Sequence, residues 1–229
     1  MISVVTSITG GKDTLIDGQV KGDAQWTAYL GRENLWSSTD WDIKLAYDKF
    51  NSARRNSRIH KLLIHKYVNT QYSLWLDGNL KLLVPPQILI EKYLKNHDIA
   101  VFKHPTRDCI YAEAIECAKR GLDNVETIIE QARAYEIDGY AKNRGLGEGM
   151  FILRRHTPKV EAFNNAWWAE YCRYSVRDQI SFMYALDKTG LRCNFIDDQF
   201  QTIKEGDKER WIRGGIIEIV PHLTPQQEI

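Results

Sequence analysis

Two oxygen-bearing side chains, Asp77 and Asn79, stand one residue apart directly after the apolar segment 72–76 (YSLWL). That segment predicts a short buried strand, and ligand sites in open α/β sheets gather at the carboxyl ends of strands. The two side chains could hold a hard divalent ion, Mg²⁺ or Mn²⁺, that bridges a nucleoside diphosphate, and Gly78 would let a ligand approach the backbone closely. Asp-Gly-Asn is also common turn chemistry, so a turn without a ligand is the competing interpretation.

Basic side chains precede this turn in the sequence. Helical spacing over residues 53–67 places four of them, at offsets of four, three and four, along one side of a predicted helix: Arg54, Arg58, Lys61 and His65. A cationic face suits a diphosphate because guanidinium and ammonium groups neutralise its charge and bind it at fixed geometry. The solvated face of an amphipathic helix is the alternative, and both interpretations stay open.

The elements that would position these residues alternate between strands and helices. The β-branched run Ile2–Ile8 predicts a strand buried on both faces that opens into a Gly-Gly loop. Further strands are predicted at 25–30, 43–50, 72–76, 99–102, 150–153 and 192–196, and helices at 53–67, 86–96, 109–120, 125–136, 157–174 and from 175 onward. This alternation is typical of an α/β domain with a mainly parallel central sheet flanked by helices.

Composition excludes several classes of protein. At 229 residues, 43% hydrophobic and 27% charged, the chain suits one domain with a sizeable core. Its 31 Lys and Arg nearly balance 30 Asp and Glu, so we expect no nucleic-acid partner. No uninterrupted apolar stretch reaches the roughly 18 residues of a transmembrane segment. The N-terminal residues lack the pattern of a signal peptide, so we expect a cytoplasmic protein unless a targeting segment has been trimmed.

Five ordered motifs carry a family resemblance. They are SRxxKLxxHK at 57–66, YSLWLDGN at 72–79, HxxR at 104–107 with Glu113-Ala114, EGMFILR at 148–154 followed by HTP at 156–158, and RDQISF at 177–182. Over about residues 57–186 the chain resembles the plant family of Golgi glycosyltransferases linked to mucilage and turgor phenotypes, one member of which is described as an alkaline ceramidase. More broadly the pattern is similar to GT-A nucleotide-sugar transferases. The resemblance implies a single GT-A-like domain over residues 1–229, in which 1–105 bind the nucleotide sugar and 106–229 form the acceptor and catalytic half with the C-terminal tail.

The resemblance also implies roles for donor-binding residues. Thr6 and Ser7, at the end of the first strand, would lie beside the nucleoside. Arg58 and Lys61, with Arg54 on the same basic helix, would lie beside the ribose or the diphosphate. These residues would therefore bind the nucleoside diphosphate half of the donor.

For the metal, the resemblance implies that Asp77 and Asn79 bind Mn²⁺ or Mg²⁺ and that Asp77 also contacts the donor. Some GT-A enzymes add a histidine near the C-terminus as a third ligand, and His222 is the candidate here, with an ordinary loop histidine as the alternative. Asn79 departs from the Asp-x-Asp pattern of the fold. Its amide oxygen carries no charge, so either the metal binds less tightly or the basic helix does part of the metal's work.

Asp178 has two competing roles. Ser175-x-x-Asp178 fits a capping box, in which the acid stabilises the start of a helix by about 1 kcal/mol. In inverting GT-A enzymes an acid at the start of a comparable helix deprotonates the acceptor hydroxyl, which makes Asp178 the catalytic candidate. In a retaining enzyme Asp178 would instead bind a sugar hydroxyl.

The remaining motif residues are expected to line the sugar or acceptor pocket. In a retaining enzyme Glu148 or the backbone of Gly149 would crowd the reacting face. His104 and Arg107 match the family pattern and are expected in the same pocket, with a structural salt bridge as the alternative.

The resemblance implies transfer of a sugar from a nucleoside diphosphate sugar, with a UDP-sugar favoured, to the hydroxyl of a glycan, protein or lipid acceptor. A ceramidase-like amidase is one alternative, but the six histidines are dispersed and show no metal-site spacing. A non-catalytic module that binds nucleotide sugars is the other, because Asn79 could reflect lost turnover.

Overall fold

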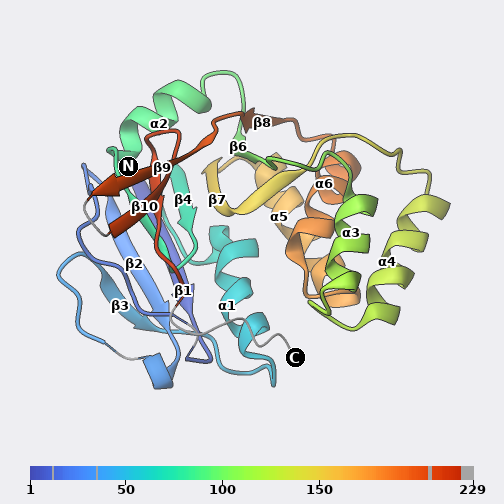
Figure 1. Ribbon diagram of the computed structural model, residues 1–229, viewed down its shortest axis with the longest axis horizontal. Coiled ribbons are helices and arrows are strands. Elements are labelled where there is room, and N and C mark those ends of the chain that lie inside the picture. The colour runs from blue at the N-terminus through green and yellow to red at the C-terminus, as the bar shows by residue number, and fades with distance from the viewer. Residues whose placement is uncertain (12, 35, 206–207, 223–229) are drawn as a thin grey trace.

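A seven-stranded sheet with the order β3-β2-β1-β4-β7-β6-β8 forms the centre of the molecule (Figure 1). The computed structural model describes residues 1–11, 13–34, 36–205 and 208–222. The strands are β1 (Ile2–Ile8), β2 (Gln25–Leu30), β3 (Asp42–Leu45), β4 (Tyr72–Leu76), β6 (Ile99–Lys103), β7 (Gly147–Arg155) and β8 (Cys193–Ile196). β7 runs antiparallel to β4 and β6, and the other neighbours are parallel. The predicted α/β fold with a mainly parallel sheet is confirmed.

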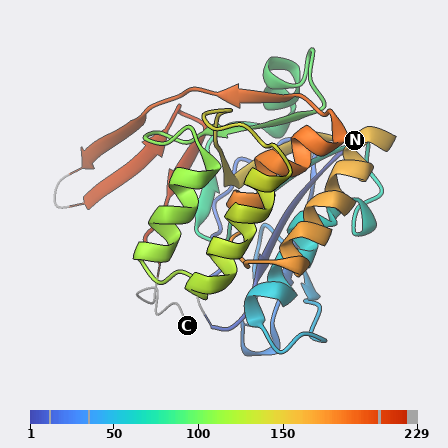
Figure 2. The same cartoon turned by 90° about the vertical axis from the view of Figure 1, so that its right-hand side faces the viewer.

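Helices cover one face of this sheet. They are α1 (Ala53–Leu62), the 3₁₀ turn η2 (Ile64–Lys66), α3 (Ile110–Lys119), α4 (Val125–Ile137), α5 (Pro158–Arg173) and α6 (Asp178–Thr189) (Figures 1 and 2). They bury one hydrophobic core against the sheet, centred on Trp75, Ile152 and Trp167, each fully buried. Alternate residues of each strand point to opposite faces, so the same strands also supply a second core.

The opposite face carries α2 (Pro86–Tyr93) and a second sheet, which the sequence analysis did not predict. This sheet is antiparallel, with the order β5-β11-β10-β9, and its strands are β5 (Leu80–Leu82), β9 (Phe200–Glu205), β10 (Lys208–Arg213) and β11 (Ile217–Ile219). Leu80, Leu82 and Ile217 pack with Leu74 and Leu76 of β4 in the second core. β9 and β10 project from the body of the molecule as a hairpin (Figure 2). β5 follows the Asp77-Gly78-Asn79 turn directly, so this turn joins the two sheets.

The predicted boundaries lie within three residues of the observed ones, except for two elements. The strands predicted at 2–8, 25–30 and 72–76 coincide with β1, β2 and β4. The strand predicted at 43–50 is shorter, because β3 ends at Leu45 where its pairing with β2 ends. The helix predicted at 53–67 ends at Leu62 and continues as η2, because Leu63 leaves the helical conformation with ψ 35°.

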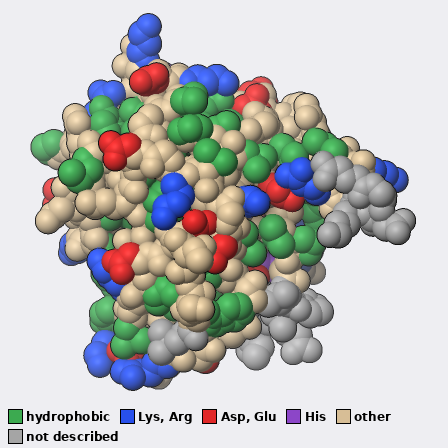
Figure 3. Space-filling model, turned by 90° about the vertical axis from the view of Figure 1, so that its left-hand side faces the viewer, with side chains coloured by type: hydrophobic (Ala, Val, Ile, Leu, Met, Phe, Trp, Pro, Cys, Tyr) green, Lys and Arg blue, Asp and Glu red, His purple; other side chains and the backbone are tan. Residues whose placement is uncertain are grey.

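The surface agrees with the near-neutral composition. On the face shown in Figure 3, basic and acidic side chains are interspersed among hydrophobic ones. Within the described residues, no helix is long and apolar enough to cross a membrane. The division of function between residues 1–105 and 106–229 stays a prediction, as does the cytoplasmic location.

Candidate functional site

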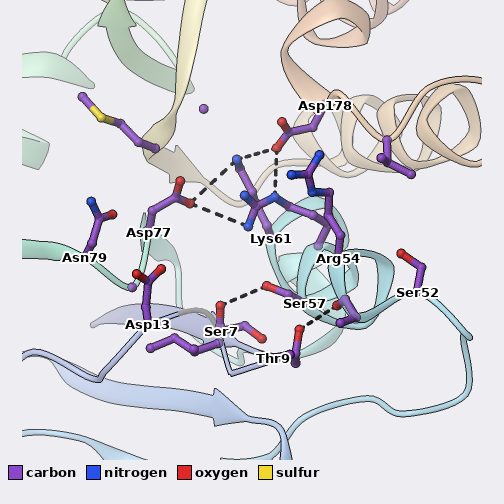
Figure 4. Close-up of a pocket in the computed structure, with 18 of the residues that line it drawn as sticks. Ser7, Thr9, Asp13, Ser52, Arg54, Ser57, Lys61, Asp77, Asn79 and Asp178 are labelled. Atoms are coloured by element: carbon purple, nitrogen blue, oxygen red, sulfur yellow. Dashed lines mark hydrogen bonds and ion pairs between the residues drawn. The ribbon is translucent and has the colours of Figure 1, made fainter. Parts of the chain in front are cut away.

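A cavity of about 1060 Å³ opens at the carboxyl ends of β1 and β4 (Figure 4). The start of α1, the start of β7 and the start of α6 form its other walls. Its lining includes ten of the predicted site residues, eight of which are Ser7, Arg54, Arg58, Lys61, Asp77, Asn79, Asp178 and His222. Glu148 and Gly149 line it as well. Segments far apart in the sequence therefore meet at the predicted edge of the sheet.

Local hydrogen bonds fix the junction of β1 and α1. The Ser52 side chain accepts the backbone N–H of Arg55 and caps α1. The Ser57 hydroxyl donates to the Ser7 carbonyl at 2.9 Å, and the Thr9 hydroxyl donates to the Ala53 carbonyl at 2.6 Å (Figure 4). These bonds hold the first two turns of α1 against the end of β1, and with them the basic side chains.

Thr6 does not line the cavity, and its place beside the nucleoside stays a prediction. Its side chain points away from the ligand space and lies under the turn, where a Cβ on Gly78 would come 3.9 Å from the Thr6 hydroxyl. Ser7, the next residue, lines the cavity, because side chains alternate along a strand. The same turn is packed so tightly that a Cβ on Gly78 would lie 2.6 Å from Ile8 Cγ1.

Two cations and two carboxylates form a charged network inside the cavity. Lys61 Nζ lies 2.5 Å from Asp178 Oδ2 and 3.9 Å from Asp77 Oδ1. Arg58 Nε lies 3.4 Å from the same Asp178 oxygen, and Arg58 Nη1 lies 3.9 Å from Asp77 Oδ1. The Lys61 side chain is only 2% exposed. The network joins α1, the end of β4 and the start of α6.

Burial and ion pairing shift the pKa values of Lys61, Asp178 and Arg58. Burial lowers the pKa of Lys61, although the neighbouring Asp178 and Asp77 oppose this shift. Burial would raise the pKa of Asp178, but Lys61 and Arg58 hold it well below its usual range. Burial would lower the pKa of Arg58, but Asp77 and Asp178 more than offset this and raise it. Asp178 is therefore an ionised counter-ion near neutral pH.

The start of α6 does not form the capping box considered for Ser175 and Asp178. The cap residue is Arg177, and no side chain caps the helix. The Ser175 hydroxyl instead donates to Asp123 at 2.8 Å and accepts the backbone N–H of Arg177. Asp178 points into the cavity, so its carboxylate is available to the site, and its role as a base stays a prediction.

The predicted metal ligands all line the cavity, but each is already engaged. Asp77 Oδ1 accepts the Trp75 indole N–H at 2.7 Å and has Lys61 and Arg58 beside it. The Asn79 amide donates to the Val220 carbonyl at 3.0 Å, and Val220 N–H donates to the Asn79 carbonyl. His222 Nδ1 lies 2.6 Å from Asp13 Oδ1. Among the described residues no three His, Cys, Asp or Glu side chains are grouped to hold a metal ion, and metal binding by Asp77, Asn79 and His222 stays a prediction.

His104 and Arg107 lie outside the lining of this cavity, and their place in a sugar or acceptor pocket stays a prediction. Arg107 Nε donates to the buried Glu113 carboxylate at 2.7 Å, and His104 accepts the backbone N–H of Arg107. The alternative of a structural salt bridge is the one observed. His65 is also turned away from the cavity and contacts Asn164.

Glu148 and Gly149 line the cavity as predicted, for different reasons. The Glu148 carboxylate pairs with Arg213, a fully buried side chain from β10. A Cβ on Gly149 would lie 2.7 Å from Lys61 Nζ and 3.6 Å from Asp178 Oδ2. The absence of a side chain at Gly149 therefore leaves the room that Lys61 occupies.

The cavity lining also contains four residues that were not predicted from the sequence: Asp13, Ser52, Arg177 and Gln179. Arg177 and Gln179 flank Asp178 in the RDQISF motif and could have been found from that motif. Asp13 follows the Gly-Gly loop after the first strand, the region where open α/β sheets bind ligands. Its contact with His222 spans 209 positions and leaves no local signal.

Comparisons with known proteins give the family. The chain is 31% identical over 172 residues to the Arabidopsis thaliana protein named "Probable hexosyltransferase MUCI70", a match that covers 70% of this chain and 30% of the relative. It is 26% identical over 144 residues to "Alkaline ceramidase TOD1" of Arabidopsis thaliana, covering 58% of this chain and 31% of the relative. The chain thus spans about a third of the length of these curated relatives.

Two solved structures are similar to most of the chain at low identity. Apo mouse xyloside xylosyltransferase 1 has 9% identity and a TM-score of 0.45, with coverage of 86% of this chain and 84% of that one. Galactosyltransferase LgtC with donor and acceptor sugar analogues has 11% identity and a TM-score of 0.44, with coverage of 84% and 73%. The family model described as "TOD1/MUCI70, glycosyltransferase-like domain" matches residues 35–206, three quarters of the sequence and most of the cavity lining. The chain belongs to the TOD1/MUCI70 glycosyltransferase-like domain family.

Proposed function

We propose that this protein is a glycosyltransferase that moves a sugar from a nucleoside diphosphate sugar, with a UDP-sugar as the favoured donor, to a hydroxyl acceptor. The observation that carries the proposal is the pair of cations, Arg58 and Lys61, held in a cavity at the carboxyl ends of β1 and β4. Ligands of open α/β sheets bind at this edge. Family membership and the hexosyltransferase named among the relatives support the same reaction class.

The cavity offers each part of the donor a chemically matched wall. The Ser7 hydroxyl is buried and, within the described part of the chain, has no hydrogen-bond partner, so it is suited to a nucleoside. Arg58 and Lys61 can bind the diphosphate and stabilise the charge that grows on it as the sugar–oxygen bond breaks. Asp178, Glu148 and Gly149 face the same space and are left for the sugar and the acceptor, which we propose to be a glycan, a protein or a lipid.

An amidase is the less supported candidate. The relative named as an alkaline ceramidase matches at 26% identity. A metal-dependent amidase needs a cluster of ligands to activate water, and no group of three His, Cys, Asp or Glu side chains is placed for this in residues 1–11, 13–34, 36–205 and 208–222. Fatty acid release from ceramide by the purified chain would favour the amidase.

Calorimetric titration with UDP, GDP and CMP tests the proposed donor class. The wild type should bind one of them, and Arg58→Ala should bind it about 10- to 100-fold more weakly, because a hydrogen bond to a charged group contributes about 1.5–3 kcal/mol. Arg55→Ala is the matched control, since Arg55 lies on the same helix outside the cavity lining. Absence of binding to every nucleotide would contradict the proposal, and binding without release of nucleoside diphosphate from its sugars would indicate a non-catalytic module.

A further inference from the structure

The charges around Asp77 bear on how the diphosphate is held. The two cations approach a single oxygen of this carboxylate, each at 3.9 Å, while the Trp75 indole N–H occupies the same oxygen at 2.7 Å. A divalent ion bound to Asp77 would therefore sit beside two positive side chains at short range. Repulsion between like charges falls only as the inverse of their distance, so it would weaken binding of the ion.

The other two expected ligands, Asn79 and His222, do not offset this repulsion. Asn79 contributes no charge, and its amide is oriented by its hydrogen bond to Val220. His222 is paired with Asp13 through Nδ1. The three expected ligands thus offer a divalent ion one carboxylate, which two protein cations approach at 3.9 Å, and this departs from the clustered oxygen ligands that Mg²⁺ and Mn²⁺ favour.

Lys61 has instead the properties of a built-in cation. Its side chain is 2% exposed, and its Nζ lies 5.9 Å and 6.0 Å from the ring centres of Trp75 and Trp167. Gly149 leaves it room, and Asp178 fixes it at 2.5 Å. A cation that is already placed and desolvated stabilises developing negative charge without reorganising at the moment of reaction.

We infer that Lys61 and Arg58 bind the nucleoside diphosphate directly, and that no divalent ion is needed for this binding. The inference rests on the proposed function, because it concerns the same cavity. When the diphosphate enters, its oxygens compete with Asp178 and Asp77 for the two cations. The two aspartates thus hold the cations in place until the ligand arrives, and Asp77 is a competitor of the diphosphate and no metal anchor.

Titration of the full chain with UDP, in EDTA and again in Mn²⁺ or Mg²⁺, tests the inference. We expect dissociation constants that agree within about threefold in all three buffers. Lys61→Met, which keeps the length of the side chain and removes its charge, should bind at least tenfold more weakly with or without metal. Lys66→Met is the control, because Lys66 is an exposed lysine outside the cavity lining.

Asp77→Asn distinguishes direct binding of the diphosphate by the two cations from binding through a divalent ion, even if Lys61→Met fails to fold. Asn keeps an oxygen for the Trp75 N–H but removes the competing charge, so UDP should bind several-fold more tightly in EDTA. UDP affinity that is at least tenfold higher in Mn²⁺ than in EDTA, or UDP binding that is lost in Asp77→Asn, would overturn the inference and leave the proposed function intact. No binding of UDP, GDP or CMP in any buffer would remove both.

Discussion

Replacing Asp178 with asparagine should destabilise the protein strongly, because the carboxylate neutralises two buried cations. The side chain is 15% exposed, and its Oδ2 lies 2.5 Å from Lys61 Nζ and 3.4 Å from Arg58 Nε. The variant keeps the size and shape of the side chain but leaves Lys61 with the more distant carboxylate of Asp77, at 3.9 Å. Breaking a buried ion pair by removing one member costs about 3–5 kcal/mol.

At about 3 kcal/mol, this loss should lower the melting temperature by roughly 6–12 °C, since a domain of this size loses about 2–4 °C per kcal/mol. Urea unfolding at pH 7 gives the free energy directly. Asp197→Asn is the control, because Asp197 pairs with Lys103 on the surface at 64% side-chain exposure. That pair should contribute less than about 1 kcal/mol. Equal stability of the two variants would refute the argument that Asp178 is a buried counter-ion.

The stability of the wild type and of Asp178→Asn, compared as a function of pH, tests whether Asp178 stabilises the fold in its ionised form. Lys61 and Arg58 hold the pKa of Asp178 below its unfolded value of about 3.9, so its contribution is fully present above that pH. The contribution is lost as the pH falls through the lower folded pKa. The difference in free energy of unfolding between wild type and Asp178→Asn should therefore be constant from pH 7 to about 5 and become smaller below about pH 4.

The predicted role of Asp178 as a general base is tested separately. It predicts that Asp178→Asn lowers kcat about 10²- to 10⁴-fold and retains nucleotide binding.

Three further predictions follow from other contacts. Gly149→Ala should weaken UDP binding about tenfold in calorimetry, because its Cβ would lie 2.7 Å from Lys61 Nζ and displace it, whereas unchanged binding would show that Lys61 can relocate at no cost. Arg107→Ala should lower the free energy of unfolding by about 3 kcal/mol, since it removes the guanidinium that pairs with the buried Glu113 carboxylate, yet the folded fraction should bind UDP normally, and impaired binding would return Arg107 to the ligand site. Burial lowers the pKa of His60 to about 3 and of His156 to about 4, so both stay neutral in the fold while the unfolded chain protonates below about pH 6.5. Stability in urea should therefore fall as the pH drops from 6.5 towards 4, and His60→Gln should reduce that slope by up to about 1.4 kcal/mol per pH unit, whereas an unchanged slope would contradict a neutral His60.

Local patterns predicted the parts of the fold that local residues determine. The uninterrupted β-branched run of β1 and the short apolar run of β4 identified two buried central strands, and the polar turn after β4 identified the edge of the sheet where the cavity opens. The basic spacing of Arg54, Arg58 and Lys61 correctly placed three cavity cations, because i, i+3 and i+4 positions share a helix face.

Long-range pairing set the limits of prediction. β5 pairs with β11 across more than a hundred residues, with Leu82 opposite Ile217, and a three-residue strand has too little local pattern to be found without its partner. The contact between Asp13 and His222 is equally invisible in the sequence. His104 and Arg107 follow a central strand just as Asp77 does, yet Arg107 turns to the buried Glu113 carboxylate, because that charge needs a partner.

Asn79 takes on a different meaning once its two hydrogen bonds are considered together. The backbone carbonyl of Asn79 accepts a hydrogen bond from the Val220 N–H, and the Asn79 side-chain amide donates one to the Val220 carbonyl. Asn79 thus binds both backbone polar groups of Val220. An aspartate, which has no N–H to donate, would present a negative oxygen to that carbonyl and weaken this binding. Asn79, the residue that departs from the Asp-x-Asp motif, thus holds the segment that carries His222 at the rim of the cavity through two hydrogen bonds. Asn79→Asp would restore the Asp-x-Asp pattern, but it would remove the side-chain hydrogen bond to Val220 and so weaken the attachment of this segment to the rim.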